Sequence, residues 1–286
     1  MLGNILQFCE EMMIKGYLSI LFFVLQMGIY GMSSFEEAME EGYNPQTYRN
    51  AKRFKQMYEK CHFEKIHQST YPIIPKIIHQ IWIGGDVPEK FKPLMQTWID
   101  KHPDWDYKLW TDEDVELFAF ENLEAFKYAQ NLGAKSDIWR YEILKQYGGV
   151  YVDVDFECVS PLTPLVYSHK FFAGIGGFDY INNAIIGSMP NHPILIRLMT
   201  ILKATPKENL NNPWHHTGPL LFTKQVYSYL KNHPEEGIVY PVRFFYPLPN
   251  TYRHSYWRGE LSQEEIHTFF IPETFGVHYW AESWVH

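Results

Sequence analysis

In the larger, C-terminal part of this 286-residue chain, runs of β-type residues alternate with helical segments, and this alternation constrains the fold more than any other feature. Each run is rich in β-branched and aromatic residues and ends in glycines or polar turn residues. The expected strands are 76–83, 105–110, 150–156, 170–174 and 184–188. The expected helices are 88–102, 133–147, 193–203 and 219–232, with another that begins at Thr111. Such alternation predicts an α/β domain around a mostly parallel sheet.

The composition is that of a globular protein with a surplus of acidic side chains. Apolar residues make up 46% of the chain, which is enough for a substantial core. The formal net charge is −8, whereas binding of nucleic acid needs concentrated positive charge, so nucleic acid is not an expected partner. The three cysteines, Cys9, Cys61 and Cys158, are too scattered for a disulfide framework or a zinc site, and we expect free thiols.

The N-terminal segment 1–35 is a candidate membrane anchor or export signal. No charged residue occurs between Gly16 and Phe35, and about 20 apolar residues suffice for a helix that crosses a bilayer. The segment is equally typical of a signal peptide that is cleaved near Gly31. A third interpretation is a helix of the core. The first two predict a membrane-associated protein or one on the secretory route, and the third predicts a cytoplasmic protein.

Two further divisions follow along the chain. Residues 36–70 are polar and of mixed charge, which is typical of a helix with a solvated face, and we expect a helical stem there. The main domain is expected to cover 71–286, without internal repeats.

Two carboxylates near the end of the run 150–156 form the strongest candidate site. The chain contains three Asp-x-Asp pairs: Asp104/Asp106, Asp112/Asp114 and Asp153/Asp155. The first fits a polar connection, and the second fits the first turn of a helix, where acidic side chains favour the helix dipole. In the third, strand alternation predicts that Asp153 and Asp155 share one face with Tyr151, while the valines and Phe156 share the other.

Adjacent like charges of this kind need a partner. Two carboxylates about 4 Å apart repel by about 4 kcal/mol at an effective dielectric constant of about 20, which either raises one pKa or favours a bound cation. Ligands of α/β sheets collect at the carboxyl ends of strands, where Asp153 and Asp155 fall. Ions such as Mg²⁺ take one or two carboxylates and complete their shell with water and phosphate. The alternative is a pair of solvated acids at a strand exit.

The helix that precedes this strand carries a second candidate pair. Asp137 and Arg140 lie three residues apart and therefore on one helix face. Next to a metal, a carboxylate and a guanidinium can grip sugar hydroxyls through charge-assisted hydrogen bonds. The alternative is an ordinary ion pair on a helix surface.

Seven linked motifs carry a resemblance to a known family. They are IPKIIHQIWIG (74–84), WDYKLW (105–110), SDIWR (136–140), YGGVYVDVD (147–155), NNAIIG (182–187), TGP (217–219) and HYWAESW (278–284). In this order they resemble glycosyltransferase family 32, whose members carry a DxD sugar-binding region and include initiating mannosyltransferases and capsule enzymes. The fold of that family is related to the glucosylating domains of clostridial toxins. The resemblance covers the chain from about Ile74 to its C-terminus and implies an α/β GT-A fold.

The resemblance also implies roles for individual residues. Trp82 would stack on the nucleobase of a nucleotide-sugar donor. Asp137 and Arg140 would bind the donor sugar, with Asn183 close to the transferred sugar. Asp153 would contact ribose or sugar and share a metal ion, Mn²⁺ or Mg²⁺, with Asp155.

The C-terminal motif completes this implied site. His278 would be a further metal ligand, although the toxins use an acid there and Glu282 is the alternative in this chain. Ser283 and Trp284 would close over the diphosphate of the donor.

The function that the resemblance implies is transfer of a hexose from a nucleotide-sugar to an acceptor hydroxyl, with the anomeric configuration retained. A UDP-sugar is the preferred donor and GDP-mannose the second choice, and the acceptor is a glycan, a lipid or a protein. Two other interpretations stay open. Phosphatases of the haloacid-dehalogenase type also place Asp-x-Asp after an apolar strand, although Glu157 stands where they need Thr or Val. A non-catalytic carbohydrate-binding protein would fit the aromatic content of 17%.

Overall fold

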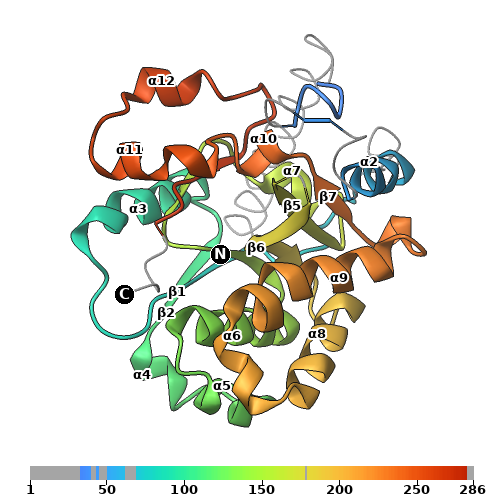
Figure 1. The fold of residues 1–286 in the computed structure, drawn as a ribbon, viewed down its shortest axis with the longest axis vertical. Helices are drawn as coiled ribbons and strands as arrows, with labels where there is room; N and C mark the ends of the chain where they lie inside the picture. The colour runs from blue at the N-terminus through green and yellow to red at the C-terminus, as the bar shows by residue number, and fades with distance from the viewer. Residues whose placement is uncertain (1–32, 40–42, 45–49, 62–68, 178, 282–286) are drawn as a thin grey trace, which may run out of the picture.

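A computed structural model describes residues 33–39, 43–44, 50–61, 69–177 and 179–281 of the chain. Its centre is a six-stranded sheet with the order β2-β1-β3-β6-β5-β7 (Figure 1). These strands are β1 (Ile77–Ile81), β2 (Asp106–Trp110), β3 (Gly149–Val152), β5 (Phe171–Gly177), β6 (Tyr180–Ser188) and β7 (Ile238–Tyr240). A second, two-stranded sheet pairs β4 (Phe156–Cys158) with β8 (Gly276–His278).

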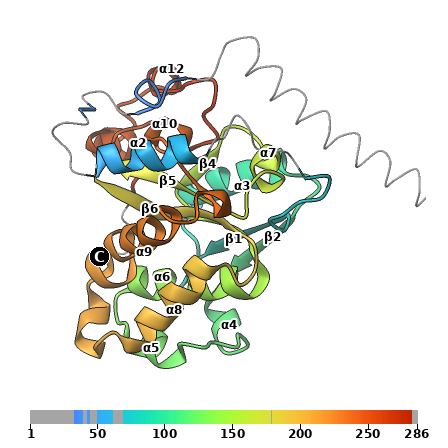
Figure 2. The ribbon, with the colours of Figure 1, turned by 90° about the vertical axis from the view of Figure 1, so that its right-hand side faces the viewer.

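Helices cover both faces of the large sheet. The α-helices are α2 (Ala51–Lys60), α3 (Lys92–Lys101), α4 (Asp112–Val115), α5 (Leu123–Tyr128), α6 (Leu132–Tyr147), α7 (Thr163–Val166), α8 (Pro193–Ala204), α9 (Pro219–Leu230), α10 (Val242–Phe245), α11 (Arg253–Trp257) and α12 (Gln263–His267). Figure 2 shows α5, α6, α8 and α9 on one side of the sheet and α3, α10 and α12 on the other. The expected α/β class with a central sheet flanked by helices is confirmed.

The sheet is mixed, with a parallel part around β1. The pairings β1–β2, β1–β3 and β5–β7 are parallel, whereas β6 runs antiparallel to both β3 and β5. The antiparallel β5–β6 pair is a hairpin, which needs no crossover helix. Two consecutive antiparallel pairings therefore interrupt the parallel order at the middle of the sheet, a feature that strand and helix alternation alone does not reveal.

The junction between α6 and β3 depends on two glycines. Gly148 ends α6 with φ 65° and Gly149 begins β3 with φ 95°, conformations that residues with a side chain rarely adopt. A Cβ atom on Gly149 would lie 2.7 Å from the carbonyl oxygen of Ile77 on β1. The glycine pair therefore ends the helix and also lets β3 approach β1 closely.

The prediction of a single strand at 150–156 is wrong. β3 ends at Val152 and β4 begins at Phe156, whose N–H donates to the carbonyl of Asp153 at 3.2 Å and closes a turn. Val154, in this turn, is buried in a different apolar cluster from the one that contains Val152. The chain leaves the large sheet here because β4 must pair with β8, a partner that lies more than a hundred residues later in the sequence.

The described part of 36–70 packs on the domain. Helix α2 buries Phe54 and Met57 in the main core, and it contacts the edge strand β7. The expected helix is therefore present, with one apolar face against the sheet edge. The proposed anchor or signal lies outside the described residues, apart from Ser33 to Phe35. Of the helices that the structure describes, none has both the length and the apolarity to cross a bilayer.

Three buried histidines act as neutral bridges in the core. In His102, Nδ1 donates to the carbonyl of Trp98 at 2.9 Å, and Nε2 accepts from the N–H of Leu162 at 2.9 Å. His79 and His192 likewise pair one ring nitrogen with a carbonyl and the other with an N–H. Burial lowers the pKa of each of the three to about 4. Each ring is neutral in the folded chain because the charged form would set two N–H groups against each other.

These histidines predict a loss of stability in mild acid. A histidine with a pKa of about 4 in the folded chain and about 6.5 when unfolded binds more protons in the unfolded state between these values. Stability from this group is thus fully present above pH 6.5 and falls as the pH drops towards 4. Between pH 7 and pH 5, the free energy of unfolding should therefore fall by about 2 kcal/mol less in the His102→Asn variant than in the wild type. Urea unfolding at both pH values measures the difference.

The exposed His267 provides the matched control. A His267→Gln variant should follow the wild-type pH dependence. Equal pH dependence in the wild type and the His102→Asn variant would contradict the assignment of His102 as a buried neutral ring.

Candidate active site

A pocket of about 380 Å³ opens where β1 and β3 end, and it collects most of the residues predicted from the sequence. The predicted residues that line it are Trp82, Asp137, Arg140, Asp153, Asp155, Asn183 and His278. They come from the residue after β1, from α6, from the β3–β4 turn, and from β6 and β8, so the pocket joins segments from most of the domain. Ser283, Trp284 and the alternative ligand Glu282 lie outside the described residues.

The two carboxylates of the Asp-x-Asp motif meet across a turn. The N–H of Asp153 still pairs with the carbonyl of Ala184 on β6 at 2.9 Å, so Asp153 keeps the direction that the strand gives it. Asp155 lies beyond the bend, next to the two-stranded sheet, where its carbonyl accepts from the N–H of Tyr279 at 3.0 Å. The sequence predicts that strand alternation brings the carboxylates together. In the structure they meet because the chain passes from one sheet to the other between them.

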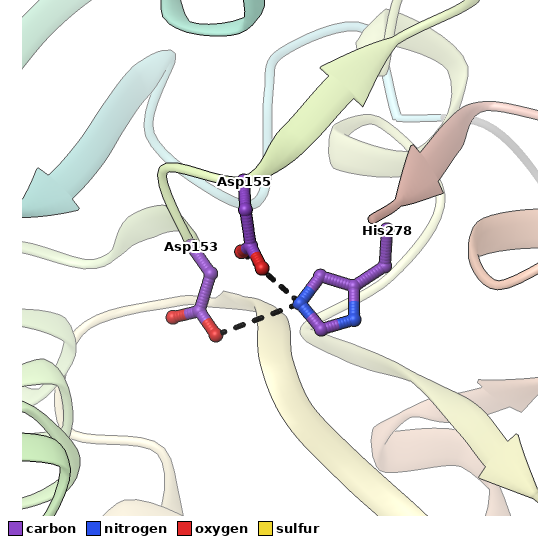
Figure 3. Close-up of side chains that lie close together, drawn as sticks. All are labelled: Asp153, Asp155 and His278. Atoms are coloured by element: carbon purple, nitrogen blue, oxygen red, sulfur yellow. Dashed lines mark hydrogen bonds and ion pairs between the residues drawn. The ribbon is translucent and has the colours of Figure 1, made fainter. Parts of the chain in front are cut away.

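His278 completes a cluster with these two carboxylates (Figure 3). Its position on β8 is directly opposite Phe156 on β4, which places the imidazole beside the turn. Nε2 of His278 lies 3.1 Å from Oδ1 of Asp155 and 4.0 Å from Oδ2 of Asp153. One ligand atom from each of the three residues lies within 4.8 Å of the others.

In each carboxylate, protein donors hold one oxygen and leave the other directed at the cluster. Oδ1 of Asp153 accepts from the hydroxyl of Tyr151 at 2.6 Å and lies 3.3 Å from Nη2 of Arg140. Oδ2 of Asp155 accepts from the N–H of Ala281 at 2.7 Å. Outer partners of this kind orient carboxylate ligands before an ion arrives.

The charges of the cluster are coupled. Burial opposes ionisation of Asp155, but the nearby His278 outweighs it and holds the pKa of Asp155 below its ordinary value. Burial likewise opposes a charge on His278, yet Asp155 raises the pKa of His278 above its usual range. The pKa of Asp153 is raised, chiefly by burial, in spite of the attraction of Arg140. Two carboxylates and one imidazole thus share a site with an excess of negative charge.

This donor set fits a divalent cation. Carboxylate oxygens suit Mg²⁺ and Mn²⁺, and neutral imidazole nitrogen suits transition metals, so a mixed set of this kind favours Mn²⁺. An ion bound there would replace the proton between Asp155 and His278 and offset the repulsion between the carboxylates. Of the residues that the structure describes, no other group of three His, Cys, Asp or Glu side chains has this arrangement.

Asp137 and Arg140 form a buried pair, which rules out the alternative of a surface ion pair. Each is 5% exposed, and Nη2 of Arg140 lies 3.4 Å from Oδ1 of Asp137. The same Nη2 lies 3.3 Å from Oδ1 of Asp153, so one guanidinium links the two candidate pairs. Nη1 of Arg140 donates to the carbonyl of Asn183 at 2.7 Å, and the guanidinium stacks over the ring of Tyr151 at 4.3 Å.

Asp137 is held by two further side chains. Its Oδ1 accepts from Nδ2 of Asn183 at 2.7 Å, and its Oδ2 accepts from the hydroxyl of Thr217 at 2.8 Å. Burial raises the pKa of Asp137 to about 6, although Arg140 and these hydrogen bonds lower it. A Cβ atom on Gly218 would lie 2.9 Å from Oδ2 of Asp137, so only glycine fits at that position without displacing the carboxylate.

Sequence reasoning gave no site role to several side chains that support these groups. Thr217 holds Asp137, and Tyr151 holds Asp153. Tyr141 binds both the Asn183 amide and the Thr217 carbonyl. The TGP motif marked Thr217 without a role, and Tyr151 was placed only on the same strand face as the aspartates. Their hydrogen bonds join residues that are distant in the chain, and no local pattern reveals them.

Trp82 lies on the wall of the pocket, just after β1. Its backbone N–H donates to the carbonyl of Trp110 at 2.9 Å, which continues the β1–β2 pairing by one residue. The indole is half-buried and packs against Phe91 with ring centroids 5.4 Å apart. Its position is compatible with stacking on a flat ligand ring.

The cluster predicts stabilisation by Mn²⁺. An ion that binds only the folded chain adds about 2.7 kcal/mol at about one hundred times its Kd, which corresponds to a rise in Tm of about 5 °C. We expect this rise in the wild type and its loss in Asp155→Asn and His278→Ala variants, measured by thermal unfolding with and without Mn²⁺.

The exposed Asp106, from another Asp-x-Asp pair, provides the control. Asp106→Asn should keep the full rise in Tm. A rise of equal size in the Asp155→Asn variant would place the ion elsewhere.

The chain is similar in sequence to known proteins. The sequence profile of the family described as "Glycosyltransferase sugar-binding region containing DXD motif" matches residues 88–172. The matched segment includes Asp137, Arg140, Asp153 and Asp155.

Several curated proteins are similar in sequence. A mannosyl phosphorylinositol ceramide synthase of Saccharomyces cerevisiae is 35% identical over 60% of this chain and 48% of its own. The inositol phosphoceramide mannosyltransferase 3 of Schizosaccharomyces pombe is 30% identical over 72% of this chain and 56% of its own. An uncharacterized glycosyltransferase of Acanthamoeba polyphaga mimivirus is 30% identical over 58% of this chain and 70% of its own.

Among solved structures, the PaToxG glycosyltransferase aligns with a TM-score of 0.46 at 20% identity, over 66% of this chain and 84% of its own.

The chain spans about half the length of the two yeast relatives and more than two thirds of the viral one. By this sequence similarity, the chain belongs to the family of glycosyltransferases with a sugar-binding region that contains the DXD motif.

Proposed function

We propose that this chain transfers a hexose from a nucleoside diphosphate sugar to an acceptor hydroxyl, with a divalent cation held by Asp153, Asp155 and His278. One observation carries the proposal: a single pocket is lined both by the three-residue cluster and by the buried Asp137–Arg140 pair. Such a pocket offers a place for a charged diphosphate next to groups that bind hydroxyls.

The donor sugar would lie against Asp137, Arg140 and Asn183. Each carboxylate oxygen of Asp137 already accepts one hydrogen bond, from Asn183 or Thr217, and keeps capacity for a sugar hydroxyl. The guanidinium of Arg140 is fixed by carbonyl and hydroxyl acceptors, so its orientation does not depend on the ligand. The nucleobase would stack on Trp82, and Ser283 and Trp284 would cover the diphosphate.

A bound cation would supply positive charge to the diphosphate as it leaves. Around that ion, Tyr151 and Arg140 would keep Asp153 in place, and the N–H of Ala281 would do the same for Asp155. These contacts would hold the ligand oxygens at fixed positions whether or not the donor is present.

We propose that the reaction retains the anomeric configuration. The carboxylates among the described lining residues are Asp137, Asp153 and Asp155, and each is engaged by protein donors. Retention is what the family resemblance implies. Since none of these carboxylates is left free as a nucleophile, we favour a front-face reaction over one with a covalent intermediate. In a front-face reaction, the acceptor oxygen bonds to the anomeric carbon on the side from which the phosphate oxygen leaves, and the acceptor proton passes to that phosphate oxygen.

The names of the relatives support a choice of substrates. Both yeast relatives are named for mannosyl transfer and for an inositol phosphoceramide product or acceptor. We therefore propose a mannosyl donor such as GDP-mannose ahead of the UDP-sugars preferred from the sequence alone, and an inositol phosphate headgroup on a lipid as the acceptor. A lipid acceptor would also suit attachment to a membrane or the secretory route through the segment 1–35. The catalytic domain would be 71–286, with 36–70 as a stem whose helix α2 packs on that domain.

A donor panel tests the proposed function. The full chain in detergent is incubated with GDP-mannose, UDP-glucose, UDP-galactose or UDP-N-acetylglucosamine, with Mn²⁺ or EDTA, and with inositol phosphoceramide micelles. We expect nucleotide release and a glycosylated lipid from GDP-mannose with Mn²⁺ only, and loss of both in Asp155→Ala. Proton NMR of the product should show an α-linkage, and a β-linkage would refute retention. Absence of Mn²⁺-dependent release from every donor would refute the proposed function.

The hydrogen bond between Thr217 and Asp137 predicts a specific defect. The Thr217→Val variant keeps the shape of the side chain but removes the donor to Oδ2 of Asp137. Loss of this donor would raise the pKa of Asp137 above its present value of about 6. The carboxylate would then ionise less readily and bind the sugar less tightly. We expect the Kd of the donor to rise by about tenfold, measured by calorimetry with the nucleotide-sugar.

The exposed Thr200 on α8 provides a matched threonine outside the pocket. Thr200→Val should bind the donor as the wild type does. An unchanged Kd in Thr217→Val would mean that Asp137 does not bind the sugar.

A further inference from the structure

Two aromatic side chains at the pocket have no role in the donor site. Tyr180 begins β6, and Trp214 lies in the π-helical turn η4 (Pro213–Thr217) before α9. Both line the pocket, and their rings meet edge to face with centroids 5.0 Å apart. Trp214 is 42% exposed, and no other tryptophan in the described part of the chain is so open to solvent. An exposed Trp214 beside a half-buried Tyr180 at a pocket is a candidate binding surface.

The local backbone is built to place these rings. Cβ atoms on Gly176 and Gly177 would each lie 2.8 Å from the ring of Tyr180, so the two glycines of the β5–β6 hairpin leave the space that this ring occupies. The turn that carries Trp214 is closed by a hydrogen bond from the N–H of Gly218 to the carbonyl of Pro213 at 2.6 Å. Proline at its first position restricts it further. The aromatic surface is therefore preorganised.

The same two segments hold the sugar-binding carboxylate. Tyr180 lies three residues before Asn183, and Trp214 lies three residues before Thr217. Asn183 and Thr217 donate to the two oxygens of Asp137. The aromatic pair is thus tied through two short stretches of backbone to the group that would bind the donor sugar. A molecule that rests on the pair would lie beside that sugar.

The chemistry of this surface fits a hydroxylated ring. Sugars and cyclitols have an apolar face of C–H bonds that packs on aromatic rings, and their hydroxyls lie around the edge of the ring. Asn182 lines the same pocket. Its Oδ1 accepts from the N–H of Ala184 at 3.0 Å, which leaves the amide NH2 group as a polar donor. A fatty chain would gain nothing from these polar neighbours.

We propose that Tyr180 and Trp214 form the acceptor subsite, on which a six-membered polyhydroxylated ring stacks next to the donor sugar. That the bound ring is the acceptor rests on the proposed function, but binding of a ring to this surface does not depend on catalysis. The acceptor ring can be a sugar or a cyclitol, since both present the same kind of face.

Saturation-transfer NMR tests the subsite without catalysis. The full chain is mixed with millimolar methyl α-D-mannoside or myo-inositol 1-phosphate, and the two probes distinguish the sugar from the cyclitol source. We expect transfer from the protein to the ring C–H protons of at least one probe in the wild type. Trp214→Ala should lose most of this transfer, whereas Trp214→Phe should keep most of it. Tyr128→Ala, an exposed aromatic that does not line the pocket, should resemble the wild type.

Steady-state kinetics provides a second measurement. In Trp214→Ala we expect the KM of the acceptor to rise by about tenfold while the KM of the donor changes less than about twofold. No transfer to either probe in the wild type would overturn the inference, as would equal transfer in Trp214→Ala. An equal rise in both KM values would assign Trp214 to the donor site instead. Ring-proton transfer without any donor turnover would refute the proposed function and leave the binding surface standing.

Discussion

The guanidinium of Arg140 is the interaction on which the site depends. It is buried between Asp137 and Asp153, at 3.4 Å and 3.3 Å from their nearest oxygens. The buried carboxylate of Asp137 would cost several kcal/mol without a partner, and the half-buried Asp153 in the same pocket would repel it as well. One fixed cation offsets both penalties. Arginine can do this because its planar fork addresses several acceptors at once, which a lysine cannot.

The negative charge of Asp155 is offset by the C-terminal segment. Asp155 faces His278, and the backbone of the C-terminal segment donates to it through Ala281. That segment is itself held in an unusual conformation. Trp280 has φ 52°, and its indole donates to the carbonyl of Leu248 at 2.8 Å and packs on the ring of His278. A strained residue persists where its surroundings over-determine it, and here they do so beside the candidate metal ligands.

The pocket therefore depends on the complete domain. Asp153 belongs to the end of the six-stranded sheet, and Asp155 belongs to the start of the two-stranded one. His278 reaches them only when β8 pairs with β4. Asp137 in turn depends on Asn183 from β6 and on Thr217 from the turn before α9. Loss of any one of these distant segments would remove a partner from a buried charge, so the site and the fold are stabilised together.

The sequence by itself determined the α/β class, the positions of most helices and strands, and seven residues of the pocket. The class, the elements and the two charged pairs follow from local rules: β-branched runs make strands, acids and glycines mark helix ends, and adjacent carboxylates favour a bound cation. Trp82, Asn183 and His278 were implied only by the family resemblance. Only the tertiary structure decided that the carboxylates meet across a turn between two sheets, that β6 runs antiparallel to its neighbours, and that Tyr151 and Thr217 hold the aspartates. The physical reason is distance along the chain. Local patterns report the preferences of a few neighbouring residues, whereas strand direction, buried hydrogen bonds and the shape of a pocket depend on contacts between residues that can lie more than a hundred positions apart.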